Sequence, residues 1–108
     1  MNKVKDKLPA LVEEELAAAM EEHPLFASAH EGYAVLLEEA EEAEKELQDV
    51  RLHLSRLWNG AKIDYEGYVA DAAIYVKCAA INLAAEAIQV AAMAQKMLVS
   101  LGTEKVTP

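Results

Sequence analysis

Apolar residues recur at helical spacing along three stretches of this chain. In the first stretch, about residues 8–22, they repeat at i, i+3 and i+4, and Pro24 closes it. The second follows Ser28, which with Glu31 three residues later forms a capping box. Its apolar stripe continues for about seven turns, and Gly60 is the expected stop. The pattern predicts two helices separated by a short turn.

A third helix is predicted from Asp64, as its N-cap, to Gly102. Eleven of the 25 residues from 70 to 94 are alanine, which lets neighbouring backbones approach on several faces. Such a helix belongs at the centre of a bundle, and three helices cannot cover it on all sides. We therefore predict one all-α domain, an antiparallel helical bundle over residues 8–101 with a frayed tail at 102–108, completed as a homodimer or homotetramer.

Composition narrows the classes of partner. The 108-residue chain carries 19 acidic and 10 basic residues, a net charge of −9, which disfavours binding to nucleic acid. Its one cysteine, Cys78, lies in an apolar stretch, which predicts a buried thiol in a reducing cytoplasm. Residues 69–94 are apolar, but Asp71, Lys77 and Glu86 interrupt them, so we expect a buried helix of a soluble protein rather than a membrane span.

Six glutamates crowd into residues 36–47, LLEEAEEAEKEL. On a helical wheel Glu39, Glu42 and Glu46 share one side next to the apolar stripe, whereas Glu41 and Glu44 point elsewhere. The ordinary interpretation is a solvated helix face. The alternative is that part of this charge holds a metal ion.

Glu86 stands among alanines and isoleucines, where a lone carboxylate is costly to bury. A cation shared with Glu39 and Glu42 would relieve that cost. The alternatives are a neutral Glu86, or an ion pair with Arg51 or Arg56. Oxygen ligands favour Mg²⁺, with Mn²⁺ also possible. No histidine completes the Glu-x-x-His motif of di-iron bundles.

The stretch HEGYAVLLEEAEEAEKEL, followed about forty residues later by EAIQVAAMAQK, resembles the MazG-like all-α nucleoside triphosphate pyrophosphohydrolases, in particular the short phage or prophage type. The resemblance covers roughly Pro24 to Met97. It implies that an ExxE pair on one helix and an ExxD pair on the next hold Mg²⁺ against the phosphates of a nucleotide. Glu39 and Glu42 match the first pair, with Glu38 as a neighbour in a shifted register, and Glu86 opens the second.

Gln89 stands where the family has aspartate, so a neutral amide replaces one anionic ligand. Its carbonyl can still bind a metal or a metal-bound water, but with less attraction for Mg²⁺. The resemblance implies hydrolysis of a nucleoside triphosphate to the monophosphate and pyrophosphate. A catalytically degenerate helical oligomer that acts as a structural or interaction module is the alternative, and Gln89 favours it. A coiled-coil adaptor fits the alanine-rich third helix poorly.

Basic and aromatic residues supply the remaining candidates for contact with the substrate. Arg56 and Lys62, with Arg51, are the nearest basic residues that could reach phosphates. His30 and Trp58 could stack on a base, as could Tyr33, although Tyr33 fits the core and Trp58 a helix end.

Overall fold

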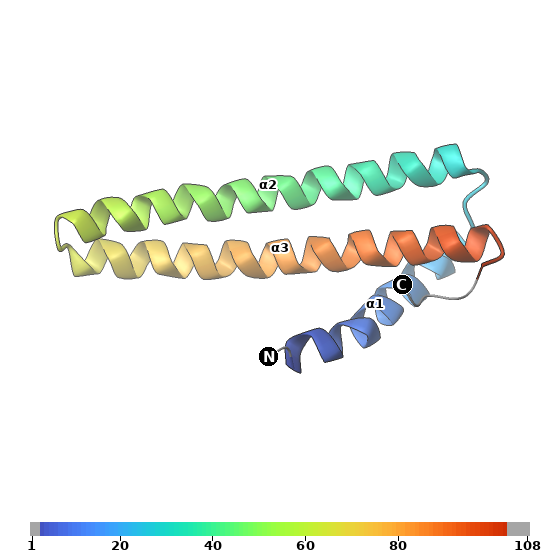
Figure 1. The fold of residues 1–108 in the computed structure, drawn as a ribbon, viewed down its shortest axis with the longest axis horizontal. Helices are drawn as coiled ribbons and strands as arrows, with labels where there is room; N and C mark the ends of the chain where they lie inside the picture. Colours follow the sequence, from blue (N-terminus) through green and yellow to red (C-terminus); the bar gives the residue numbers. More distant parts are fainter. Residues whose placement is uncertain (1–2, 104–108) are drawn as a thin grey trace. The chain divides into compact units, whose positions relative to one another are not determined.

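The computed structural model describes residues 3–103, and every regular element within that range is a helix. In chain order these are α1 (Lys3–Glu22), α2 (Ala29–Lys62) and α3 (Glu66–Ser100) (Figure 1). The all-α prediction is confirmed. Helix α1 begins at Lys3 rather than near Leu8. The sequence pattern does not reveal its first turns, because they are exposed and contain charged residues without apolar periodicity.

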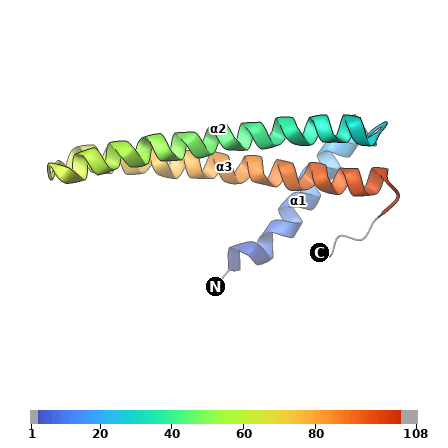
Figure 2. The same ribbon diagram turned by 45° about the horizontal axis from the view of Figure 1, so that its top comes forward.

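The chain divides into two compact units. The first contains α1, the start of α2 up to Ala40, and the end of α3 from Ala87. The second, Glu41–Glu86, is a helical hairpin made from the rest of α2 and α3. Within this hairpin the two helix segments lie side by side in both views (Figures 1 and 2).

The first unit has a small apolar core, in which Phe26, Ala92 and Met93 are buried. Ser100 Oγ accepts a 2.9 Å hydrogen bond from the Phe26 N–H and donates one of 2.8 Å to the Lys96 carbonyl. These bonds fix the α1–α2 connection against the end of α3. Six partly buried side chains complete the core: Val12, Leu16, Ala19, Val35, Leu36 and Met97.

Gly32, near the start of α2, is also buried, and a side chain there would meet the Met97 side chain. The predicted cap at Ser28 is confirmed in one of the two bonds of a capping box. The Glu31 N–H donates to Ser28 Oγ at 3.2 Å, and the Glu31 carboxylate accepts from the Ala27 N–H at 2.7 Å. The first bond satisfies one of the N–H donors that an uncapped helix start would leave open. The second holds the residue before Ser28, so the reciprocal bond of the motif is displaced by one residue.

The turn between α2 and α3 differs from the prediction. Helix α2 passes through Gly60 and ends at Lys62. Gly60 allows the close packing of α3, because a Cβ there would lie 2.8 Å from the Tyr68 ring. Asp64 is not the N-cap of α3. Asp64 adopts φ 53° and occupies the left-handed position of a Schellman motif. In this motif the Tyr65 N–H donates to the Gly60 carbonyl at 2.9 Å, and the Asp64 N–H donates to the Ala61 carbonyl at 3.1 Å.

Helix α3 ends at Ser100, two residues before the predicted end, and it ends in the same motif, with Gly102 at φ 79°. The Thr103 N–H bonds the Leu98 carbonyl at 2.8 Å, and the Gly102 N–H bonds Val99 at 3.0 Å. The two helix ends therefore differ in the residue that takes the left-handed conformation. The predicted fraying of the tail falls mostly on residues 104–108, outside the described part of the chain.

We expect Asp64→Gly to stabilise the protein by about 1 kcal/mol, because glycine adopts positive φ without the steric cost that a Cβ imposes. Thermal unfolding of the variant against the parent protein measures this change. Asp64→Asn is the matched control, because it removes the charge but keeps the Cβ, and should change stability far less. If Asp64→Gly were destabilising, the carboxylate of Asp64 would be acting as a cap after all.

Many large apolar side chains are exposed on the described residues, among them Ile74, Ile81, Leu54 and Trp58. By length and composition α3 could also cross a membrane, and 17% of its most apolar window is buried within the chain. The expectation of a buried α3 is thus not met by one chain alone. Cys78 and Tyr33, both expected inside, are exposed as well. Apolar periodicity identifies these faces, but a single chain of three helices does not cover them.

Candidate functional site

Glu42 on α2 and Glu86 on α3 meet in the helical hairpin. A carboxylate oxygen of one lies within 4.8 Å of a carboxylate oxygen of the other. Glu86 is half-buried and Glu42 is exposed. Burial, followed by the charge of Glu42 and a hydrogen bond with it, raises the pKa of the Glu86 carboxyl above its usual value. Two carboxylates can share such a bond only when one of them carries a proton, or when a cation takes the place of that proton.

Glu46, one turn after Glu42 on α2, adds a third acidic group to the hairpin. Its charge also raises the pKa of Glu86. One oxygen of Glu46 is buried and has no hydrogen-bond partner among residues 3–103. An unpaired carboxylate oxygen is costly in such a position. The acidic oxygens of this hairpin are the type of donor that a divalent cation such as Mg²⁺ prefers.

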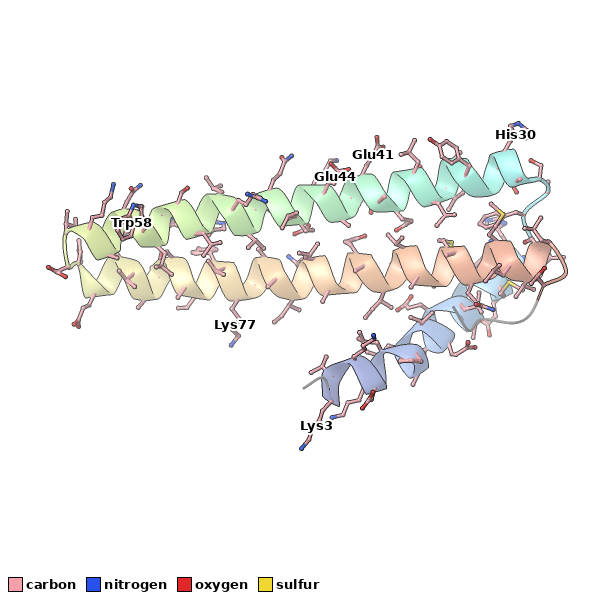
Figure 3. All side chains as sticks on the ribbon, viewed as in Figure 1. Lys3, His30, Glu41, Glu44, Trp58 and Lys77 are labelled. Carbon is pink, nitrogen blue, oxygen red and sulfur yellow. The ribbon has the colours of Figure 1, made fainter. Side chains whose placement is uncertain are left out.

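Glu39 precedes Glu42 by three residues on helix α2 and belongs to the first unit. Glu39 is half-buried and already takes part in an interaction. Glu41 and Glu44 point away from α3 in the hairpin (Figure 3). The predicted division of the six glutamates into two faces is confirmed for these two residues.

Gln89 lies in the first unit, where its amide nitrogen donates a 2.6 Å hydrogen bond to the carboxylate of Glu15 on α1. This bond uses one of the two amide N–H donors, and the carbonyl oxygen is the atom that can bind a metal. Glu15 also places a negative charge beside the position where the family pattern has aspartate. Sequence reasoning missed Glu15, because it is one of three consecutive glutamates and nothing local distinguishes it.

The residues predicted to contact the phosphates or the base of a nucleotide do not lie next to the carboxylates of Glu42 and Glu86 in the hairpin. Arg56 is 14 residues after Glu42 on α2, about 21 Å along the helix axis. Its guanidinium pairs with Asp71 at 2.9 Å and bonds His53 Nδ1 at 2.8 Å. No ion pair joins Glu86 to an arginine among residues 3–103. Arg56 therefore pairs with Asp71 and not with Glu86, which was the alternative that the sequence left open.

Lys62 and Trp58 also lie apart from the carboxylates of the hairpin, and His30 belongs to the first unit. Lys62 Nζ lies 5.8 Å from the ring of Trp58, near the end of α2. Trp58 itself is 61% exposed. His30 lies exposed at the start of α2 in the first unit (Figure 3). One chain therefore gathers none of these side chains around Glu42 and Glu86 within the hairpin.

The first unit contains a cavity of about 530 Å³. Glu39 and Gln89, two of the predicted metal ligands, line it together with Phe26 and Lys96. Lys96 is 5% exposed and its Nζ lies 4.5 Å from the centre of the Phe26 ring. Neither Phe26 nor Lys96 was a sequence candidate, since no local motif marks them. The remaining lining residues are Ala19, Glu22, His23, Leu25, Glu31, Val35 and Met93.

Comparison with known proteins gives no match: no protein-family model, no curated protein and no solved structure is significantly similar to this chain. The case for a function therefore depends on the residues themselves.

The raised pKa of Glu86 predicts a pH-dependent stability. Below about pH 4.5, its ordinary value, the group is protonated in both the folded and unfolded states and costs nothing. As the pH rises from there to the folded-state pKa, only the unfolded state loses its proton, so the protein loses stability. Without divalent metal, Glu86→Gln should therefore raise the melting temperature at pH 7 by a few °C and leave it unchanged near pH 4.

Glu44→Gln, an exposed substitution on α2, is the control and should shift neither value. An equal shift of Glu86→Gln at both pH values would show that the effect does not come from ionisation of Glu86.

Proposed function

We propose that this protein is a Mg²⁺-dependent nucleoside triphosphate pyrophosphohydrolase, which releases a nucleoside monophosphate and pyrophosphate. The observation that carries the proposal is the meeting of Glu42 and Glu86 in the hairpin, with the unpartnered oxygen of Glu46 one turn away. Two carboxylates in contact repel each other, and one divalent cation bound between Glu42 and Glu86 would relieve that repulsion. The resemblance to the MazG-like family names the reaction.

Glu39, Glu42 and Glu86 would hold the ion, with the Gln89 carbonyl as a fourth, neutral ligand. When bound, Mg²⁺ neutralises phosphate oxygens and lowers the pKa of a coordinated water. The protein's own contribution is to hold carboxylates on two rigid helices, so that substrate and water meet in a fixed arrangement. Glu42, whose carboxylate is exposed, would accept a proton from the attacking water.

Glu15 compensates in part for the missing aspartate. Its hydrogen bond to Gln89 fixes the amide, and its negative charge lies within 2.6 Å of the amide nitrogen. An oriented carbonyl backed by a carboxylate attracts a cation more strongly than a free amide does.

We further propose that a second copy of the chain covers the exposed apolar side chains of α2 and α3, which gives a homodimer or homotetramer in the cytoplasm. Only such a copy could bring Arg56, Lys62 or Trp58 near the carboxylates, given their distance along α2. Analytical ultracentrifugation should show a mass of two or four chains. Ile74→Asp with Ile81→Asp, at two exposed sites on α3, should shift the protein to single chains, and a monomeric parent protein would contradict the proposal.

The activity is tested by incubating the full chain with a panel of ribonucleoside and deoxyribonucleoside triphosphates and measuring pyrophosphate. We expect release with Mg²⁺ or Mn²⁺ and none with EDTA. Mg²⁺ alone should also raise the melting temperature, because an ion that binds only the folded state stabilises it by mass action.

The neutral Gln89 favours a second candidate, a catalytically degenerate oligomer with a structural or interaction role. Absence of pyrophosphate release together with absence of a metal-induced shift would support that candidate. Metal binding without turnover would indicate a degenerate enzyme that keeps its ion.

A further inference from the structure

The 530 Å³ cavity of the first unit contains a buried cation that the proposed metal chemistry does not use. Lys96 is 95% buried, and among residues 3–103 no carboxylate lies within ion-pair distance of its Nζ. The ammonium instead lies over the Phe26 ring, 4.5 Å from its centre. A cation–π contact offsets only part of the desolvation cost of a lysine. The ammonium therefore retains hydrogen-bond donors for a ligand in the cavity.

The other lining residues indicate what kind of ligand this is. Phe26, Val35 and Met93 provide apolar surface, and the volume lies in the usual range of small-molecule sites. Three carboxylates, those of Glu22, Glu31 and Glu39, also line the cavity. They repel a phosphate group and accept hydrogen bonds from N–H donors. The cavity thus combines one buried donor, several acceptors and apolar walls, which suits a neutral, flat heterocycle better than an anion.

We propose that this cavity binds a guanine base, so that the substrate of the proposed enzyme is a guanine nucleotide. Guanine has a ring carbonyl next to a ring N–H and an amino group. The Lys96 ammonium would donate to the carbonyl, and the Glu22 carboxylate would accept from the N–H and amino groups. Glu39 and Gln89 line the same cavity, which connects the base site to the proposed metal ligands within the first unit.

The other bases satisfy this set less well. Adenine has no carbonyl for Lys96. Uracil and thymine have two carbonyls and a single N–H, which leaves a carboxylate facing an acceptor. Cytosine has a carbonyl and an amino group but no ring N–H in its base-paired face. A site that hydrogen-bonds a ligand rejects analogues that leave its buried polar groups unpaired.

This assignment rests on the proposed function, and its test avoids both metal and hydrolysis. The full chain in EDTA is titrated with guanosine, adenosine, cytidine and uridine, and binding is followed by NMR shifts of the Met93 methyl group and the Lys96 amide. We expect guanosine to bind at least about tenfold more tightly than the other three. Equal binding of all four, or tighter binding of another nucleoside, would overturn the assignment.

Lys96→Met keeps an unbranched side chain of similar volume and removes the ammonium group, so it should abolish the preference for guanosine. Glu22→Gln, at an exposed position, should weaken guanosine binding and should not weaken uridine binding, because the amide can donate to the second carbonyl of uracil. Lys77→Met is the matched control, because Lys77 is exposed on α3 and points away from α2 in the hairpin (Figure 3). A guanosine preference that survived both Lys96→Met and Glu22→Gln would show that other residues create it.

The two proposals fail in different ways. If no triphosphate is hydrolysed but the guanosine preference holds, the proposed enzyme activity is wrong and the base site stands. If other triphosphates are hydrolysed while guanosine is not preferred, the enzyme activity stands and the base site is wrong.

Discussion

Glu42→Gln and Glu86→Gln should each reduce Mg²⁺-dependent pyrophosphate release by on the order of 10²–10³-fold. Each substitution exchanges a charged oxygen ligand for a neutral amide of the same size, which weakens metal binding and the stabilisation of charge on the phosphates. The measurement is kcat/KM with the preferred triphosphate at saturating and limiting Mg²⁺. Excess Mg²⁺ should restore part of the activity, because part of the loss is in metal affinity.

Glu41→Gln and Glu44→Gln are the matched controls, since they change the same charge on the same helix but point away from α3. Both should keep the activity of the parent protein. Glu86→Gln is also expected to be more stable than the parent protein at pH 7 without metal, so its loss of activity cannot be assigned to unfolding. Equal activity in all four variants would remove the hairpin carboxylates from the chemistry.

Exchanging the two partners of the Glu15–Gln89 hydrogen bond should raise the affinity for Mg²⁺ about tenfold or more. In Glu15→Gln with Gln89→Glu the bond is kept in reverse, and the negative charge moves to the position where the family pattern has an acid. The single variant Gln89→Glu instead sets two carboxylates against each other and should lose about 1–3 kcal/mol of stability in EDTA. Mg²⁺ titrations of the melting temperature measure both effects.

The double variant should recover the stability that Gln89→Glu loses, which a double-mutant cycle quantifies. A tighter metal site in the double variant would place position 89 among the ligands. If the exchange weakened Mg²⁺ binding, the carboxylate of Glu15 would itself be the ligand, and Gln89 would only position it.

Local sequence patterns were sufficient for the helices and for two of the caps. Ser28 with Glu31 and Gly102 act through residues three to five positions away, so their spacing identifies them. Asp64 was misassigned because aspartate is favoured both at N-caps and, less often, at left-handed helix ends, and its sequence context does not separate the two. Gly60 was taken for a stop, although its function is to admit Tyr68 and Val69, which only the packed hairpin reveals.

Contacts between residues far apart in the sequence could be predicted only where one residue was chemically unusual for its surroundings. Glu86 was found because a carboxylate among alanines demands an explanation, and the structure places it beside Glu42. Glu15, Phe26 and Lys96 are not unusual in their local sequence. A glutamate or a lysine is common on a helix, and an aromatic residue is common in a turn, so their contacts could not be predicted. Exposure of Tyr33 and Cys78 was missed because periodicity identifies an apolar face without showing what covers it.

The two units differ in how far apart in the sequence their stabilising contacts lie, and this has a consequence for synthesis on the ribosome. The hairpin of residues 41–86 joins neighbouring helices through a three-residue connection. The first unit depends on hydrogen bonds between residues 74 positions apart, from Phe26 to Ser100 and from Gln89 to Glu15. Because loop closure over such a distance is slow and needs both ends, the hairpin can form while translation continues. Helix α1 can complete its contacts only after the end of α3 has been synthesised.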